Sequence, residues 1–157
     1  MKKAVYIEDR MKKAVIFDID GTIADVEHRR GWLRTSPPDW ERFNAEMGED
    51  RPNLPVVELY RVLWNSKQYE MVLTSGRFES SRRLTETWLI WNEIPFGNIY
   101  MRQDGDNRAD HLVKEDFLAQ IRARFGDIAF AVDDRDQVVA MWRRNGITCL
   151  QCAYGSF

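Results

Sequence analysis

The sequence predicts an α/β fold: a three-layer, Rossmann-like sandwich in which a parallel five-stranded sheet carries helices on both faces. From residue 13 onward, short apolar runs rich in Val, Ile and Phe alternate with longer amphipathic runs. Acidic or hydroxyl-bearing residues follow several of the apolar runs directly, as they do at the carboxyl ends of parallel strands. One segment, 24–53, interrupts the alternation and predicts a small insertion after the first strand.

Five strands and four long helices account for the alternation. The strands are expected at 14–18, 69–74, 98–101, 128–132 and 147–151. The helices are expected at 56–65, 80–91, 109–125 and 135–145. Gly126 and Gly146 stand where the last two helices should end, because glycine commonly terminates helices. These are the crossover helices of a parallel sheet.

The length of 157 residues suits a single domain spanning 1–157. Within it, 24–53 is the small insertion, in which Ser-Pro-Pro-Asp at 36–39 predicts a turn and a helix cap before a short helix through Met47. Residues 1–11 form an N-terminal extension. Its start, Met-Lys-Lys-Ala-Val, recurs at 11–15 and favours an extra edge strand or a duplicated start over a functional repeat.

The overall charge is nearly balanced, with 23 basic and 25 acidic residues. A balanced surface does not draw a protein onto long nucleic acid or an anionic membrane, so any anion must be captured locally. No apolar run is long enough to span a bilayer, and the start lacks the pattern of a signal peptide. We therefore expect a cytoplasmic protein with no membrane contact, and the sequence gives no sign of a protein partner.

The strongest chemical signal is Asp-Ile-Asp-Gly-Thr at 18–22, directly after the apolar run 14–17. Side chains two apart on an extended strand point the same way, so Asp18 and Asp20 can converge where the chain bends at Gly21. One carboxylate can then attack phosphorus. The other can protonate the leaving alkoxide and later take a proton from water.

An anionic nucleophile and an anionic phosphate repel each other, so the chemistry needs positive charge nearby. Asp133 and Asp134 follow the strand 128–132 and can end beside Asp18, which predicts an oxygen-rich magnesium site. Thr-Ser-Gly-Arg at 74–77 also ends a strand, where a hydroxyl, a guanidinium and the amides of the following helix start can hold phosphate oxygens. Lys114 can neutralise the phosphate or pair with an acidic group.

In this order, the motifs resemble those of the haloacid dehalogenase superfamily of phosphohydrolases. Within it, residues 12–157 are most similar to the 3′-phosphatase domain of phage polynucleotide kinase-phosphatase. The matching segments are Ser-Gly-Arg at 75–77, Arg102 with Gly105, Asp106 and Arg108, Val-Lys-Glu at 113–115, Asp-Asp-Arg at 133–135, 137–139, 141–144 and the ending Gly-Ser-Phe at 155–157.

The resemblance implies a role for each matched residue. Asp18 would be the nucleophile and Asp20 the general acid and base. Ser75 and Lys114 would bind phosphate, and Arg29, Arg77 and Arg102 would hold the substrate. Mg²⁺ would be held by the Asp18 carboxylate, the Asp20 carbonyl and Asp134, with Asp133 binding through water or orienting the site.

The implied activity is a magnesium-dependent phosphomonoesterase acting on 3′-phosphate ends of DNA or RNA, or on 3′-nucleotides. The alternatives are a 5′-nucleotidase or broad small-molecule phosphatase, and a binding or regulatory module without turnover. No Gly-x-x-x-x-Gly-Lys-Ser/Thr motif is present, so kinase activity is not expected. For Arg29, a solvated charge run is an open alternative. Trp32 and Trp40, in the insertion, are the tryptophans to test for base stacking.

Overall fold

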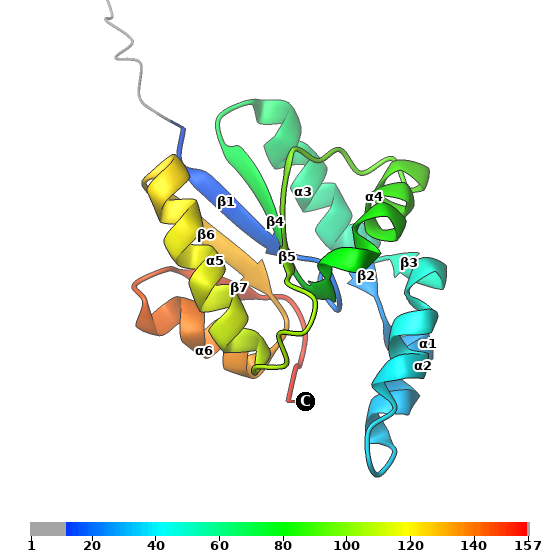
Figure 1. Cartoon of the computed structure of the whole chain (residues 1–157). Coiled ribbons are helices and arrows are strands. Elements are labelled where there is room, and N and C mark those ends of the chain that lie inside the picture. The colour runs from blue at the N-terminus through cyan, green and yellow to red at the C-terminus, as the bar shows by residue number, and fades with distance from the viewer. Residues whose placement is uncertain (1–11, 157) are drawn as a thin grey trace, which may run out of the picture.

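The structure is a computed structural model that describes residues 12–156. Its main sheet has five parallel strands in the order β5-β4-β1-β6-β7 (Figure 1). They are β1 (Ala14–Asp18), β4 (Glu70–Phe78), β5 (Asn98–Arg102), β6 (Ile128–Asp133) and β7 (Cys149–Gln151). The predicted α/β fold is confirmed. The predicted repeat of 1–5 lies outside the described residues.

The central strand, β1, shows why the sheet is covered on both sides. All five of its residues are buried, and its side chains alternate between two cores. Val15 and Phe17 pack in the core under α3 (Leu54–Ser66) and α4 (Arg82–Trp91). Ala14 and Ile16 pack in the core under α5 (Asp110–Phe125) and α6 (Asp136–Arg144), which lie on the opposite face (Figure 1). An apolar strand without polar alternation is what a doubly covered parallel sheet requires.

The helices begin and end close to the predicted residues. Gly126 terminates α5 with a positive φ of 74°, and its amide donates to the carbonyl of Arg122. The first predicted helix, 56–65, begins earlier, at Leu54, because Pro55 fits the first turn of a helix. Within residues 12–156, no helix has both the length and the apolar character needed to cross a membrane.

The insertion after β1 contains a second, two-stranded sheet that the sequence did not predict. β2 (Ala24–Asp25) pairs antiparallel with β3 (Arg51–Pro52) and so closes the base of the inserted segment. Between them lie α1 (Glu27–Arg30) and α2 (Trp40–Ala45), which project from the carboxyl end of the sheet (Figure 1). The predicted cap is present, since the Asp39 side chain accepts a hydrogen bond from the Arg42 amide.

One prediction about β4 is wrong. The strand was expected to end at 74 and the following helix to begin at 80, but the strand runs on to Phe78 and α4 begins at Arg82. The pairing with β5 shifts between Ser75 and Phe78, so two residues bulge out of the ladder. Ser75 and Arg77 are therefore presented by an irregular strand end and not by the first turn of a helix.

Candidate active site

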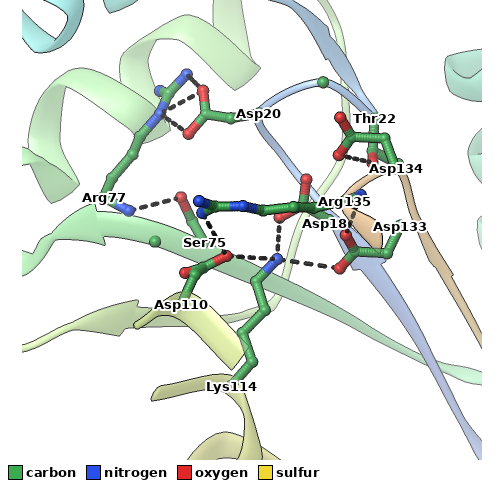
Figure 2. Close-up of polar contacts among 12 residues, drawn as sticks. Asp18, Asp20, Thr22, Ser75, Arg77, Asp110, Lys114, Asp133, Asp134 and Arg135 are labelled. Carbon is green, nitrogen blue, oxygen red and sulfur yellow. Dashed lines mark hydrogen bonds and ion pairs between the residues drawn. The ribbon is translucent and has the colours of Figure 1, made fainter. Parts of the chain in front are cut away.

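Five side chains from four elements meet at the carboxyl end of the sheet (Figure 2). Asp18 is the last residue of β1, and Asp133 is the last residue of β6 and is followed by Asp134. Ser75 comes from the irregular end of β4, and Lys114 from the second turn of α5. All five side chains are buried. Sequence reasoning assigned each of them to one site, and the sheet order explains their meeting, because β1 lies between β4 and β6.

Lys114 ties the carboxylates together. Its Nζ lies 2.5 Å from Asp18 Oδ1, 3.0 Å from Asp133 Oδ2 and 3.6 Å from Asp110 Oδ2. Burial alone would lower the pKa of Lys114, but the surrounding carboxylates Asp133, Asp18 and Asp110 outweigh it and raise the pKa well above its ordinary value. The carboxylates therefore favour the charged form of Lys114, whose ammonium group anchors one oxygen of Asp18.

Asp18, Asp133 and Asp134 form a compact cluster of oxygen donors. One ligand atom from each lies within 4.8 Å of the others. Asp18 Oδ2 and Asp134 Oδ2 are buried and accept no hydrogen bond within residues 12–156, which is costly for a carboxylate. Burial raises the pKa of Asp134 to about 6, with Asp133 adding to the rise. Such a cluster fits a hard divalent cation, which prefers carboxylate and carbonyl oxygens.

Gly21 permits the close approach of Asp134 to the loop that follows β1. Its φ is +84°, a left-handed value that side chains rarely adopt, and a Cβ placed there would lie 2.2 Å from Asp134 Oδ2. The Thr22 hydroxyl donates to the other oxygen of Asp134 at 3.4 Å. The glycine and the threonine of the acidic motif thus shape the carboxylate cluster, although neither carries charge.

Asp20 points away from the cluster toward Arg77 (Figure 2), and Arg29 contacts it as well. Arg77 donates to both of its oxygens at 2.7–3.1 Å, and Arg29 Nη2 lies 2.5 Å from Oδ1. Burial alone would raise the pKa of Asp20, but the guanidiniums of Arg77 and Arg29 outweigh it and hold the pKa well below its ordinary value. Asp20 is therefore ionised in this arrangement.

Asp50 completes this network, and sequence reasoning missed it. Its side chain is 0% exposed and accepts hydrogen bonds from Arg29 Nε at 2.7 Å, Arg29 Nη2 at 2.6 Å and Arg77 Nη2 at 3.0 Å. His28 Nε2 lies 2.9 Å from Asp50 Oδ1, the oxygen that also accepts from Arg29 Nε. Two buried guanidiniums thus share two carboxylates, Asp20 and Asp50. No local pattern marks Asp50, which stands in an ordinary polar stretch of the insertion.

Arg29 is buried, at 1% exposure, and not on a solvated face. Besides Asp20 and Asp50, its Nη1 donates to the Phe43 carbonyl at 3.0 Å, and its guanidinium covers the Phe43 ring at 4.1 Å. These contacts join the insertion to the acidic motif. The structure thus brings Arg29 to the site through Asp20.

Arg102 lies at the cavity, but its guanidinium is used by the protein itself. Nε donates to the Gly76 carbonyl at 2.9 Å, Nη1 to the carbonyls of Asp106 and Arg108, and Nη2 to Asp110 Oδ1 at 3.1 Å. It therefore fixes the loop 103–109 and orients Asp110, which faces Lys114. Gly76 allows this packing, because a Cβ there would lie 2.6 Å from Asp110 Oδ1.

A cavity of about 530 Å³ opens over these residues. Its lining includes Asp18, Asp20, Arg77, Lys114 and Asp134. It also includes residues of the insertion and of the loop before α5: Leu33, Trp40, Phe43, Asn44, Asp106, Asn107, Arg108 and Ala109. This volume is in the range of small-molecule sites, roughly 300–1,000 Å³. The charged groups and the cavity form one continuous site.

Comparison with known proteins agrees with this geometry. A family model of the polynucleotide kinase PNKP phosphatase domain matches residues 12–157. A protein described as a bifunctional polynucleotide kinase/RNA ligase, from Autographa californica nuclear polyhedrosis virus, is 29% identical over 141 residues, covering 88% of this chain and 19% of the viral protein. The chain thus spans about a fifth of that relative.

Solved structures give the same result. A chain in the structure of the Pnkp1/Rnl/Hen1 RNA repair complex superposes with a TM-score of 0.80 at 30% identity, covering 96% of this chain and 45% of that one. A haloacid dehalogenase-like hydrolase from Streptococcus pneumoniae shares the fold, with a TM-score of 0.61 at 16% identity over 90% of this chain and 84% of that one. The chain belongs to the PNKP phosphatase domain family of the haloacid dehalogenase superfamily, and it is a phosphatase.

Proposed function

We propose that the protein is a magnesium-dependent phosphomonoesterase that removes 3′-phosphates from DNA or RNA ends, or from 3′-nucleotides. The observation that carries the proposal is the environment of Asp18. Lys114 anchors one oxygen of its carboxylate, and the other oxygen is buried and accepts no hydrogen bond within the described residues. An oxygen held in place without a partner is poised to bind a cation or to attack phosphorus.

The cation would be held by the Asp18 carboxylate, the Asp20 carbonyl and Asp134, with Asp133 orienting the site. When bound, Mg²⁺ supplies positive charge that offsets the repulsion between the carboxylates and the phosphate. Lys114 and Ser75 line the same end of the sheet and are assigned to the phosphate oxygens. Arg77, whose guanidinium already faces the cavity, is assigned to the substrate as well.

The reaction then proceeds in two displacements. The Asp18 carboxylate attacks phosphorus, the bond from phosphorus to the 3′-oxygen breaks, and the departing oxygen takes a proton from Asp20. Water next attacks the aspartyl-phosphate and gives its proton to Asp20, which frees Asp18 and inorganic phosphate. Asp20 must therefore be protonated before the first step. A phosphate dianion beside Arg77 competes with Asp20 for the guanidinium, and so raises the pKa of Asp20 when substrate binds.

Nucleic-acid ends are favoured as substrates by the family and by the relatives. The family model is named for a polynucleotide enzyme, and one structural relative is part of an RNA repair complex. The balanced charge of this chain is compatible with such a substrate, because an end-binding enzyme needs only a small arginine-lined mouth. Arg29 and Arg102 would act indirectly, by holding Asp20 and Asp110 in place beside the substrate.

The decisive experiment compares phosphate release from a 3′-phosphorylated oligonucleotide, the same oligonucleotide phosphorylated at its 5′ end, and nucleoside 3′- and 5′-monophosphates. We expect the 3′-phosphorylated substrates to be preferred, and activity to be lost with a chelator and in Asp18→Asn. Asp127→Asn is the matched control, because Asp127 is exposed and precedes β6 at the opposite end of the sheet. Preference for a 5′-phosphate would refute the substrate assignment. Full activity in Asp18→Asn would refute the mechanism.

A further inference from the structure

The cavity has a wall that the proposed chemistry does not use. Trp40 and Asn44 of the insertion line the same cavity as Asp18 and Asp20. A ligand whose phosphate lies over the carboxylates can therefore touch the insertion as well. The insertion projects beyond the end of the sheet, so this wall extends the site outward from the phosphate position (Figure 1).

Of the aromatic side chains in the insertion, Trp40 offers the open surface. It is 50% exposed, and its packing on Phe43 is edge-to-face, with centroids 5.8 Å apart at 85°. Phe43 is itself buried and already covered by Arg29. Trp32 is different, because Arg42 lies 4.8 Å above its ring, its Nε1 donates to Glu46 at 3.0 Å, and it does not line the cavity.

Two amide side chains accompany Trp40. Asn44 and Asn107 line the cavity, and neither side chain makes a hydrogen bond to another residue in the described part of the chain. An amide offers two donor hydrogens and an acceptor oxygen, which suits the mixed donor and acceptor edge of a nucleobase. An aromatic surface and available amides in one cavity are the chemistry of a base-binding site.

We propose that this wall is a subsite for the terminal nucleobase: the base stacks on Trp40, and Asn44 and Asn107 bind its edge. The inference rests on the proposed function, because it assumes a nucleotide whose phosphate lies at Asp18. A cavity of about 530 Å³ is in the size range of sites that bind a small molecule such as a nucleotide. Because Asn44 and Asn107 would bind the base edge that is paired in a duplex, the subsite selects unpaired ends, and a paired terminal base would first have to unpair.

The test compares two substrates and three variants. The substrates are a single-stranded oligonucleotide with a 3′-phosphate on a normal terminal nucleoside, and the same oligonucleotide with a 3′-phosphate on an abasic terminal residue. The variants are Trp40→Ala, Trp40→Phe and the control Trp91→Ala, which removes a 78% exposed tryptophan at the end of α4. The quantity measured is kcat/KM for phosphate release.

Stacking of one base on an aromatic side chain contributes roughly 1–3 kcal/mol, which corresponds to a factor of about 5–150. We expect Trp40→Ala to lose that factor on the normal end and to change little on the abasic end, while Trp40→Phe keeps most of the activity and Trp91→Ala all of it. The wild-type protein should show the same factor between the two substrates. Equal losses on both substrates in Trp40→Ala, or no discrimination by the wild type, would overturn the proposal.

The wild-type comparison needs no variant, so misfolding of Trp40→Ala leaves the test intact. Failure of the proposed function is seen separately, as preference for 5′-phosphorylated ends. In that case, the comparison of normal and abasic ends is repeated on the preferred end and still decides whether Trp40 binds a base. A blunt duplex with the same 3′-phosphate should react more slowly than the single strand. Equal rates would contradict selection of unpaired ends.

Discussion

Asp50 provides the most demanding test of the structure, because it is far from the acidic motif in sequence and reaches the proposed phosphate site only through its contacts with Arg29 and Arg77. Replacing it by alanine removes one of the two carboxylates that neutralise Arg29 and Arg77. Its side chain is fully buried and accepts four hydrogen bonds at 2.6–3.0 Å, three of them from these two arginines and one from His28. The variant would leave two buried guanidiniums facing Asp20 alone.

The expected loss of stability follows from the burial. Breaking a buried ion pair by removing one partner costs about 3–5 kcal/mol, because the remaining charge is left uncompensated. For a domain of this size, each kcal/mol shifts Tm by roughly 2–4 °C, so Asp50→Ala should melt about 6–20 °C below the wild type. Asp50→Asn keeps an acceptor oxygen and the side-chain shape, so its Tm should lie between those of Asp50→Ala and the wild type.

Activity should fall as well, even far below the melting temperature. Arg29 and Arg77 hold Asp20, and a displacement of about 1 Å in such a group can cost up to about 100-fold in rate. Thermal melting by circular dichroism and phosphate release from a generic aryl phosphate measure the two effects. Asp127→Asn serves again as the control. If Asp50→Ala melted within about 2 °C of the wild type, the buried network described here would be wrong.

Three further predictions follow from the same site. Gly21→Ala should abolish activity and lower Tm, because its Cβ would collide with Asp134. Gly31→Ala is the control: a Cβ there meets nothing within 4 Å, so activity should not change and the free energy of unfolding should stay the same or rise by about 0.4–1 kcal/mol. Similar melting of the two variants would contradict the geometry. Mg²⁺ at 100 times its Kd should stabilise the folded protein by about 2.7 kcal/mol and so raise its Tm. An equal rise of Tm in Asp134→Asn would refute the cation site. Burial raises the pKa of Cys149 from 9.0 to about 12, so below pH 9 its thiolate fraction falls about 1,000-fold. Mass spectrometry should find slow alkylation of Cys149 in the native chain in metal-free buffer and fast alkylation in urea, and equal rates would refute the burial of this thiol.

Much of the fold could be predicted because the sheet is covered on both faces. A doubly buried strand must be apolar throughout, so β1 and β6 stand out as Val, Ile and Phe runs without any knowledge of their partners. The order of elements along the chain then places the ends of these strands together, and with them Asp18, Asp133 and Asp134. The family resemblance rested on the same strand ends.

The parts that sequence reasoning missed depend on contacts between distant segments. β2 and β3 are two residues each and carry no periodicity, so only their pairing across the insertion reveals them. The continuation of β4 past Thr74 depends on its shifted register with β5. Neither feature leaves a signal in a local pattern of apolar and polar residues.

The sequence by itself therefore determined the α/β class, the position of the acidic motif and the candidate residues at the strand ends, because burial on both faces restricts which residue types a strand can hold. Only the tertiary structure decided how the charges are paired. A charged side chain in the sequence looks the same whether it faces water or a buried partner. In the folded chain, Asp50 is the shared partner of Arg29 and Arg77, and Arg102 donates to the loop before α5. Trp40 lines the cavity, whereas the Trp32 ring is covered by Arg42.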